Sequence, residues 1–175
     1  MDFIEQVIKV KHSTFTLAEG KAYHALNSFH NHQEVELIYV ESGDGTFSVG
    51  NKSTRISGGT MILIGANVPH MFKFESNRYY DYAMKHAKPL VPLQLLTLHF
   101  DPNKLGPEFL ELAENTLLRN LLGRAKPGLF INQEAKLEAI RLLHKIALAP
   151  GHSQLLLVLQ LLHVIAESEQ LAPVS

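Results

Sequence analysis

The spacing of apolar residues changes near Phe100 and divides the chain into two parts. Before this point, short segments rich in β-branched and aromatic residues alternate with glycine-containing turns. These segments are VELIYVES, GTFSVG, STRISG, TMILIG and VPHMFKF, separated by Gly43-Asp44-Gly45, Gly50-Asn51, Gly58-Gly59 and Gly65-Ala66-Asn67. Short strands in regular succession are typical of antiparallel sheets that close into a barrel or sandwich. We therefore expect residues 1–100 to form an all-β barrel.

Residues 101–175 follow a helical period instead. Three segments place apolar residues three and four positions apart, namely EFLELAENTLLRNLL, QEAKLEAIRLLHKIAL and SQLLLVLQLLHVIAES. Proline and glycine separate these segments, and Asn132 and Ser153 are the expected N-caps of the second and third helices. We predict a helical subdomain over residues 101–175, whose last residues, EQLAPVS, begin a linker.

The last predicted helix carries more apolar surface than one stripe requires. Leucine, valine and isoleucine occupy most positions of the run LLLVLQLLHVIA, residues 155–166. Large exposed apolar surfaces usually mark contacts between proteins. We expect this helix to pack on its own domain and on a second copy of the chain, which would form a homodimer. Coverage by neighbouring helices of the same chain is the alternative.

The composition excludes several classes of protein and site. The chain has no cysteine, so any metal must be bound by histidine and carboxylate. A net charge of −1 gives no general attraction to DNA. The N-terminus lacks a signal-peptide pattern, and the longest apolar run is shorter than the roughly 20 residues of a membrane span, so we expect a cytoplasmic protein that does not bind membranes. Nucleophile elbows, phosphate-binding glycine loops and dinucleotide fingerprints are missing from the sequence.

The stretch HNHQEVE places two histidines close to a glutamate. His30, His32 and Glu36 have even numbers, so an unbulged strand would point all three to one face. Glu34 also has an even number, but a slight bulge in the strand would turn its side chain outward, to the rim of the site or to solvent. His70 would add a fourth side chain from across the barrel. Such a group can bind a divalent ion such as Zn, Ni, Fe or Mn, or its members can hydrogen-bond one another and form the polar floor of a ligand pocket.

Other histidines are expected to have structural roles. His24 and His99 lie in strand-like segments, where a half-buried ring usually bonds to a backbone partner. His144 and His163 stand among leucines of the predicted helices, where core or interface positions are expected.

The spacing of this histidine and glutamate group resembles the first motif of the cupin superfamily, His30-x-His32-x3-Glu36-x6-Gly. Residues 59–70 are similar to the second motif, which ends in His70. The resemblance implies a cupin-like β-barrel, also called a double-stranded β-helix or jelly roll. It also implies that His30, His32, Glu36 and His70 occupy the positions of the ligands in metal-binding cupins.

Five positions around these ligands depart from the cupin motifs, where glycine, an acid, proline, glycine and asparagine are usual. They are His24, Thr60, Gly65, Asn67 and Phe74. Asn67 tolerates the left-handed backbone that glycine supplies, so the turn can still form. The ligand set is complete, whereas the surroundings typical of cupin enzymes are not.

A narrower resemblance extends through the helical half. The segments HNHQEVELIYVESGDGTFSVG, GGTMILIGANVPHMF, LLTLHFDPNKLGPEFLEL and LLLVLQLLHVIAESE are similar to the N-terminal sensing part of AraC-type transcription regulators. This resemblance implies an effector in the barrel, helices that pair two subunits, and a linker to a helix-turn-helix DNA-binding domain. That DNA-binding domain is absent from this chain. We therefore expect this chain not to bind DNA itself, since the regulator would bind DNA only through the missing domain.

The sequence thus leads to two functional hypotheses. The first is the effector-sensing and dimerisation region of an AraC-family regulator, a non-enzymatic module that binds a small molecule such as a sugar near His30, His32, Glu36 and His70. The alternative is a metal-dependent cupin enzyme, a dioxygenase or isomerase, in which the same four residues bind the ion.

Overall fold

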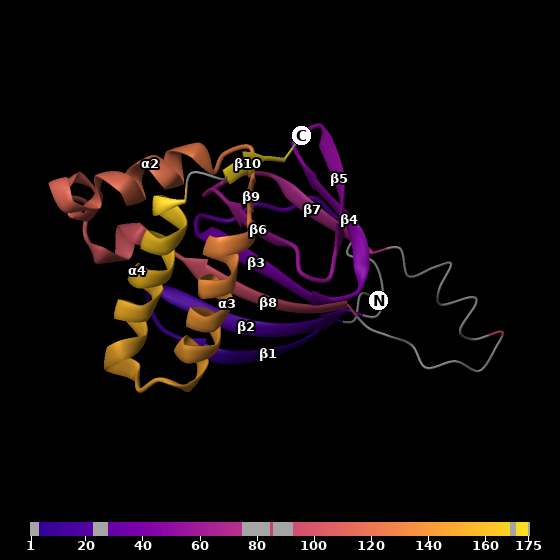
Figure 1. Cartoon of the computed structure of the whole chain (residues 1–175), viewed down its shortest axis with the longest axis horizontal. Helices are drawn as coiled ribbons and strands as arrows, with labels where there is room; N and C mark the ends of the chain where they lie inside the picture. Colours follow the sequence, from indigo (N-terminus) through magenta and orange to yellow (C-terminus); the bar gives the residue numbers. More distant parts are fainter. Residues whose placement is uncertain (1–3, 23–27, 75–84, 86–92, 169–170, 175) are drawn as a thin grey trace.

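The computed structural model of the chain describes residues 4–22, 28–74, 85, 93–168 and 171–174. Its strands form a seven-stranded sheet in the order β1-β2-β8-β3-β6-β9-β10 and a three-stranded sheet in the order β5-β4-β7. The strands are β1 (Ile4–Lys11), β2 (Phe15–Ala22), β3 (Val35–Ser42), β4 (Asp44–Val49), β5 (Lys52–Ser57), β6 (Met61–Ile64), β7 (His70–Phe74), β8 (Leu93–Phe100), β9 (Leu129–Ile131) and β10 (Leu171–Pro173). Their pairings are antiparallel, and the prediction of a β-barrel followed by helices is confirmed (Figure 1).

Strand β3 belongs to two apolar cores, because its alternate residues point to opposite sides of the sheet. Leu37 packs in a core that also contains helix residues such as Leu142. Ile38 packs with Phe47 of β4 in a second core between the two sheets. Glu36 has the same parity as Ile38, so its side chain points into the barrel. The face of β3 that carries Glu36 therefore continues into buried apolar residues, Ile38 and Val40.

The described residues of the helical half form three α-helices and three short 3-10 turns. The helices are α2 (Thr116–Arg124), α3 (Gln133–Leu148) and α4 (Gly151–Glu167), and the turns are Pro102–Leu105, Phe109–Glu111 and Ala113–Asn115. Figure 1 shows α3 and α4 side by side, and their buried residues share one core with the larger sheet. The helices therefore cover the outer face of the sheet that carries β3.

The two predicted N-caps have different outcomes. Asn132 is the N-cap of α3, as expected. Ser153 is not the N-cap of α4, because the helix already begins at Gly151 after Pro150. The extended backbone of Pro150 starts the helix there, and the Ser153 N–H donates to the Pro150 carbonyl at 2.9 Å, which places Ser153 in the first turn.

The residues after α4 return to the barrel. β10 pairs with β9, and the Val174 N–H donates to the Gly128 carbonyl at 2.9 Å. The Val174 side chain is fully buried in the core between the sheets. The segment in which a linker was expected to begin therefore contains a strand of the sheet, β10 (Leu171–Pro173), followed by the buried Val174. The helical half adds two strands, β9 and β10, to a barrel that was expected to end near residue 100.

Helix α4 buries much of its apolar surface within its own chain. Its buried apolar residues are Val158, Leu161, Leu162 and Ile165. Leu156 remains 67% exposed, as do Leu137 (67%) and Leu148 (88%) on α3. The homodimer stays a prediction, and it now depends on these exposed leucines. In the part of the chain that the structure describes, no helix is both long enough and apolar enough to cross a membrane.

We expect Gly128→Ala to lower the free energy of unfolding by about 1–3 kcal/mol, measured by urea denaturation. Gly128 has a φ of +71°, and a Cβ there would lie 3.1 Å from Cγ2 of Val174. Gly123→Ala is the matched control. Gly123 lies exposed in α2 with no atom within 4 Å of an added Cβ, so alanine should stabilise the protein by about 0.5–1 kcal/mol. Equal effects of the two substitutions would contradict the docking of Val174 against Gly128.

Candidate metal centre

The segment before β3 is not the continuous strand that the parity of its residues suggested. β3 begins at Val35, and residues 33–34 form a bend. His30 instead forms an isolated antiparallel bridge with His70, in which each backbone N–H donates to the other residue's carbonyl at 3.0 Å. The bend lets His30 and His32 approach Glu36 from a loop rather than from one strand face. The structure therefore brings the four predicted residues together, but through a bend in the chain rather than through one continuous strand.

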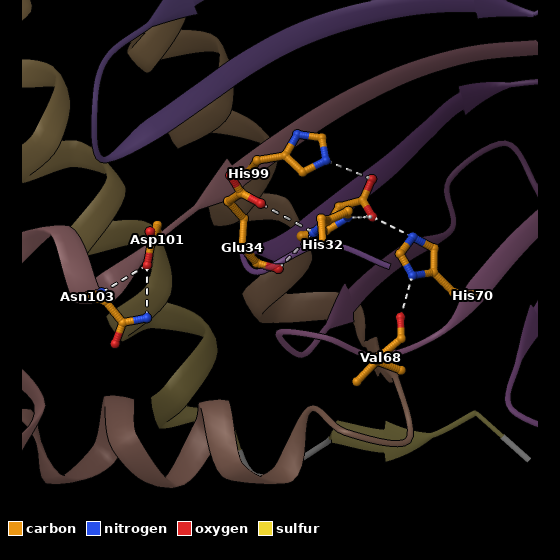
Figure 2. Close-up of polar contacts among 8 residues, drawn as sticks. His32, Glu34, Val68, His70, His99, Asp101 and Asn103 are labelled. Carbon is orange, nitrogen blue, oxygen red and sulfur yellow. Dashed lines mark hydrogen bonds and ion pairs between the residues drawn. The ribbon is translucent and has the colours of Figure 1, made fainter. Parts of the chain in front are cut away.

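Glu36 lies at the centre of the group. Its Oε2 atom is 2.8 Å from Nε2 of His70 and 3.2 Å from Nε2 of His32. Its Oε1 atom is 3.4 Å from Nε2 of His99. Glu36 and His70 are buried, whereas His30 is exposed. Figure 2 shows His32, His70 and His99 converging on this point from the bend before β3, from β7 and from β8.

Backbone carbonyls orient the histidine rings. Nδ1 of His32 donates to the Glu34 carbonyl at 2.9 Å, and Nδ1 of His70 donates to the Val68 carbonyl at 2.8 Å. A proton held on Nδ1 leaves Nε2 as the nitrogen that can bind a metal ion. In both rings Nε2 is the atom that faces Glu36. The backbone therefore presents two imidazoles to the centre in the orientation that ligands require.

The charges of the group favour an ionised carboxylate. Burial alone would raise the pKa of Glu36, but the rings of His32, His70 and His99 that contact its carboxylate outweigh this effect and hold its pKa well below the usual range. The hydrogen bond to Glu36 raises the pKa of His32. Burial of its ring, followed by the nearby His70, lowers the pKa of His30 and favours the neutral ring. A buried anion among imidazoles attracts a cation.

His99 belongs to this site, although the sequence assigned it a backbone partner. β8 pairs with β3 so that His99 is directly opposite Glu36. Its ring contacts the His32 ring edge to face, with 4.8 Å between the centroids. Alternation along LQLLTLHF indicates that His99 shares a face with Thr97, but only the register of the strands places that face beside Glu36.

The remaining predicted positions lie at the rim or away from the site. The Glu34 side chain is 44% exposed and has one oxygen 3.7 Å from Nδ1 of His32, as expected for a rim residue. His144 is exposed on α3, and His163 is exposed on α4 with its Nε2 3.2 Å from Glu167. Neither ring is in the core of the chain. His24 lies outside the described residues.

The donor set fits a divalent metal ion. One ligand atom from each of His30, His32, Glu36 and His70 lies within 4.8 Å of the others. Among the described residues, no group makes an aligned hydrogen bond to the buried Nε2 of His70, despite its short contact with Glu36. A buried nitrogen without an aligned partner is costly, and coordination would satisfy it. Three imidazoles and a carboxylate are suitable ligands for Zn, Ni, Fe or Mn.

The geometry of this site agrees with the comparison of the chain with known families. Residues 12–80 match the cupin domain family. The barrel has the cupin fold. Both predicted cupin motifs lie within the matched residues, and the structure brings their side chains His30, His32, Glu36 and His70 together. No curated protein matches the chain.

Solved structures of other proteins are similar to part of this chain at low sequence identity. A conserved protein of unknown function from Streptococcus pyogenes is 14% identical, with a TM-score of 0.44 over 58% of this chain and 77% of that chain. A cupin superfamily protein from Desulfitobacterium hafniense is 6% identical, with a TM-score of 0.45 over 56% and 77%. The cupin domain of Cnp3 from Schizosaccharomyces pombe is 9% identical, with a TM-score of 0.47 over 58% and 69%.

We expect chelator-treated protein to bind one Ni²⁺ or Zn²⁺ per chain, measured by titration calorimetry and elemental analysis. His32→Ala removes one donor atom, so the affinity should fall by more than the roughly 10–100-fold that loss of an outer hydrogen bond causes. His144→Ala, which removes an exposed histidine of α3, is the control and should bind like the wild type. A wild-type protein that binds neither ion would favour the hydrogen-bonded polar floor instead.

Proposed function

We propose that this chain is the sensing and dimerisation region of an AraC-type transcription regulator. It binds a small polar molecule in the cupin barrel, beside His30, His32, Glu36 and His70, and pairs with a second copy through α3 and α4. A DNA-binding domain outside this chain would respond to the bound molecule, in the cytoplasm. The proposal assigns the chain no catalytic activity of its own.

The observation that carries this proposal is the double role of the strands β3 and β8. On their inner face they carry Glu36 and His99. On their outer face, Leu37 and Leu98 pack in the core that contains the buried residues of α3 and α4. A ligand that moves the inner side chains therefore acts on strands that also support the helices. Packed cores shift between discrete arrangements, and this property supports transmission from the barrel to a helix-mediated dimer.

The chemistry of the centre favours an effector that contains oxygen donors. The group combines exposed His30 and half-buried His99 with a carboxylate that is already ionised. A bound divalent ion would supply a coordination position for a hydroxyl or carboxylate oxygen. His99 and His30 could then hydrogen-bond to neighbouring oxygens of the same molecule. Sugars have this donor pattern, and the resemblance to AraC-type regulators supports them as candidates.

Exposed leucines support the dimer part of the proposal. Leu137 and Leu148 are 11 residues apart on α3, which places them on one face of that helix, and Leu156 is exposed on α4. Exposed apolar side chains that gather on neighbouring helices are typical of interfaces between protein chains.

We expect Leu148→Glu combined with Leu156→Glu to shift the protein from dimer to monomer, because a charge would be buried in the interface. Light scattering coupled to size-exclusion chromatography measures this change. Leu112→Glu is the control, since Leu112 is also half exposed but lies between the 3-10 turns before α2. A wild-type protein that is already monomeric at micromolar concentration would contradict the dimer.

The second candidate is a metal-dependent cupin enzyme, a dioxygenase or isomerase. The observation that favours it is the complete set of three imidazoles and one carboxylate, together with the buried Nε2 of His70, which has no aligned hydrogen-bond partner among the described residues. A metal centre with an open position can polarise a substrate or activate water. The same four residues would then bind the ion, and His99 would lie beside the reacting molecule.

One experiment separates the two functions. We expect a sugar or hydroxy acid from a screened panel to raise the melting temperature of metal-loaded protein and to be recovered unchanged by mass spectrometry. At about 100 times its Kd, a ligand adds about 2.7 kcal/mol of stability, or roughly 5–10 °C for a chain of this size. Glu36→Gln should abolish the shift, and His144→Ala should retain it. Conversion of the compound by wild type but not by Glu36→Gln would favour the enzyme.

A further inference from the structure

The contact between His99 and Glu36 follows from the pairing of two neighbouring strands. β8 and β3 are antiparallel, and Glu36 is the registered partner of His99. Side chains of directly opposed residues lie on the same face of a sheet, close enough to interact. His99 Nε2 is 3.4 Å from Oε1 of Glu36, and the His99 side chain is 27% exposed. The ring therefore stands between the buried carboxylate and solvent.

The two carboxylate oxygens of Glu36 have different partners. Oε2 faces the ligand nitrogens, at 2.8 Å from His70 and 3.2 Å from His32. Oε1 faces away from them, toward His99. The four atoms that lie within 4.8 Å of one another come from His30, His32, Glu36 and His70, and His99 contributes none of them. His99 is thus next to the donor set without belonging to it.

We propose that His99 is a positioning residue that reserves one oxygen of Glu36 for the metal ion. An N–H of His99 that donates to Oε1 holds the carboxylate in one rotation, in which Oε2 alone is directed at the three imidazole nitrogens. The edge-to-face contact with the His32 ring, at 4.8 Å between centroids, also limits the orientation of that ligand. Partners of this kind orient metal ligands and tune the bound ion.

This inference rests on metal binding by the centre and does not depend on the regulatory or enzymatic role of the chain. Its rival is a purely structural role, in which His99 fills space between the strands and packs on His32. The two roles require different properties of a residue that replaces His99: the positioning role requires an N–H donor, and the structural role requires a flat ring. Gln keeps an N–H donor that can reach Oε1, whereas Phe keeps a flat ring without any donor. The hydrogen bond, not the ring, should therefore decide how Glu36 binds the ion.

The experiment uses the whole chain, stripped of metal and titrated with Co²⁺, whose visible absorption bands report the number and arrangement of ligands. The variants are His99→Ala, His99→Gln and His99→Phe. Thr97→Val is the matched control, because Thr97 lies two residues away on the same strand and is paired with Ile38 rather than Glu36. Circular dichroism and the melting temperature of the metal-free proteins check that each variant folds.

We expect His99→Ala and His99→Phe to weaken Co²⁺ binding about 10–100-fold and to change the absorption spectrum of the bound ion. His99→Gln should restore most of the affinity and the wild-type spectrum, and Thr97→Val should match the wild type. If His99→Phe retains the wild-type spectrum and affinity, or if His99→Gln fails like His99→Ala while folding normally, the positioning role is overturned. A wild-type protein that binds no Co²⁺ overturns the metal centre and this role together, whatever its effector.

Discussion

A buried carboxylate held by imidazoles is the interaction on which the site depends. Glu36 lies inside the barrel, where an isolated negative charge would be costly. Contacts at 2.8, 3.2 and 3.4 Å to His70, His32 and His99 offset this cost. These residues come from the bend before β3, from β7 and from β8, so the carboxylate joins both sheets of the barrel. Without the negative charge of Glu36, the electrostatic attraction that holds the rings of His32, His70 and His99 around it would be lost.

The barrel and helices form one connected structure rather than two separate units. The outer face of the larger sheet shares a core with α3 and α4, while its inner face carries the histidines and Glu36. After α4, the chain returns to add β10 and to bury Val174 between the sheets. The candidate site and the candidate dimer surface therefore share strands. This arrangement suits a sensing domain, and it would equally support a metal centre at the mouth of an enzyme's barrel.

Much of the fold could be predicted because its signals are local. Alternating apolar residues and glycine turns predicted the strands from β3 to β7, and the helical period predicted α3 and α4. The resemblance to the two cupin motifs implied that His30, His32 and Glu36 lie near His70. The predicted N-cap of α4 was wrong by three residues, because the extended backbone at Pro150 begins the helix earlier than the Ser153 side chain suggested. The strand β10 has only three residues, too few to show a period.

The sequence by itself determined which side chains are available for the site and which segments are strands or helices, because residue chemistry and periodicity are properties of neighbouring positions. Only the tertiary structure decided how these parts meet. The register of β8 against β3 brought His99 to Glu36, and a bend at residues 33–34, not a continuous strand, brought His32 there. The contact between His99 and Glu36 joins positions more than 60 residues apart, and it depends on the pairing of strands across the barrel.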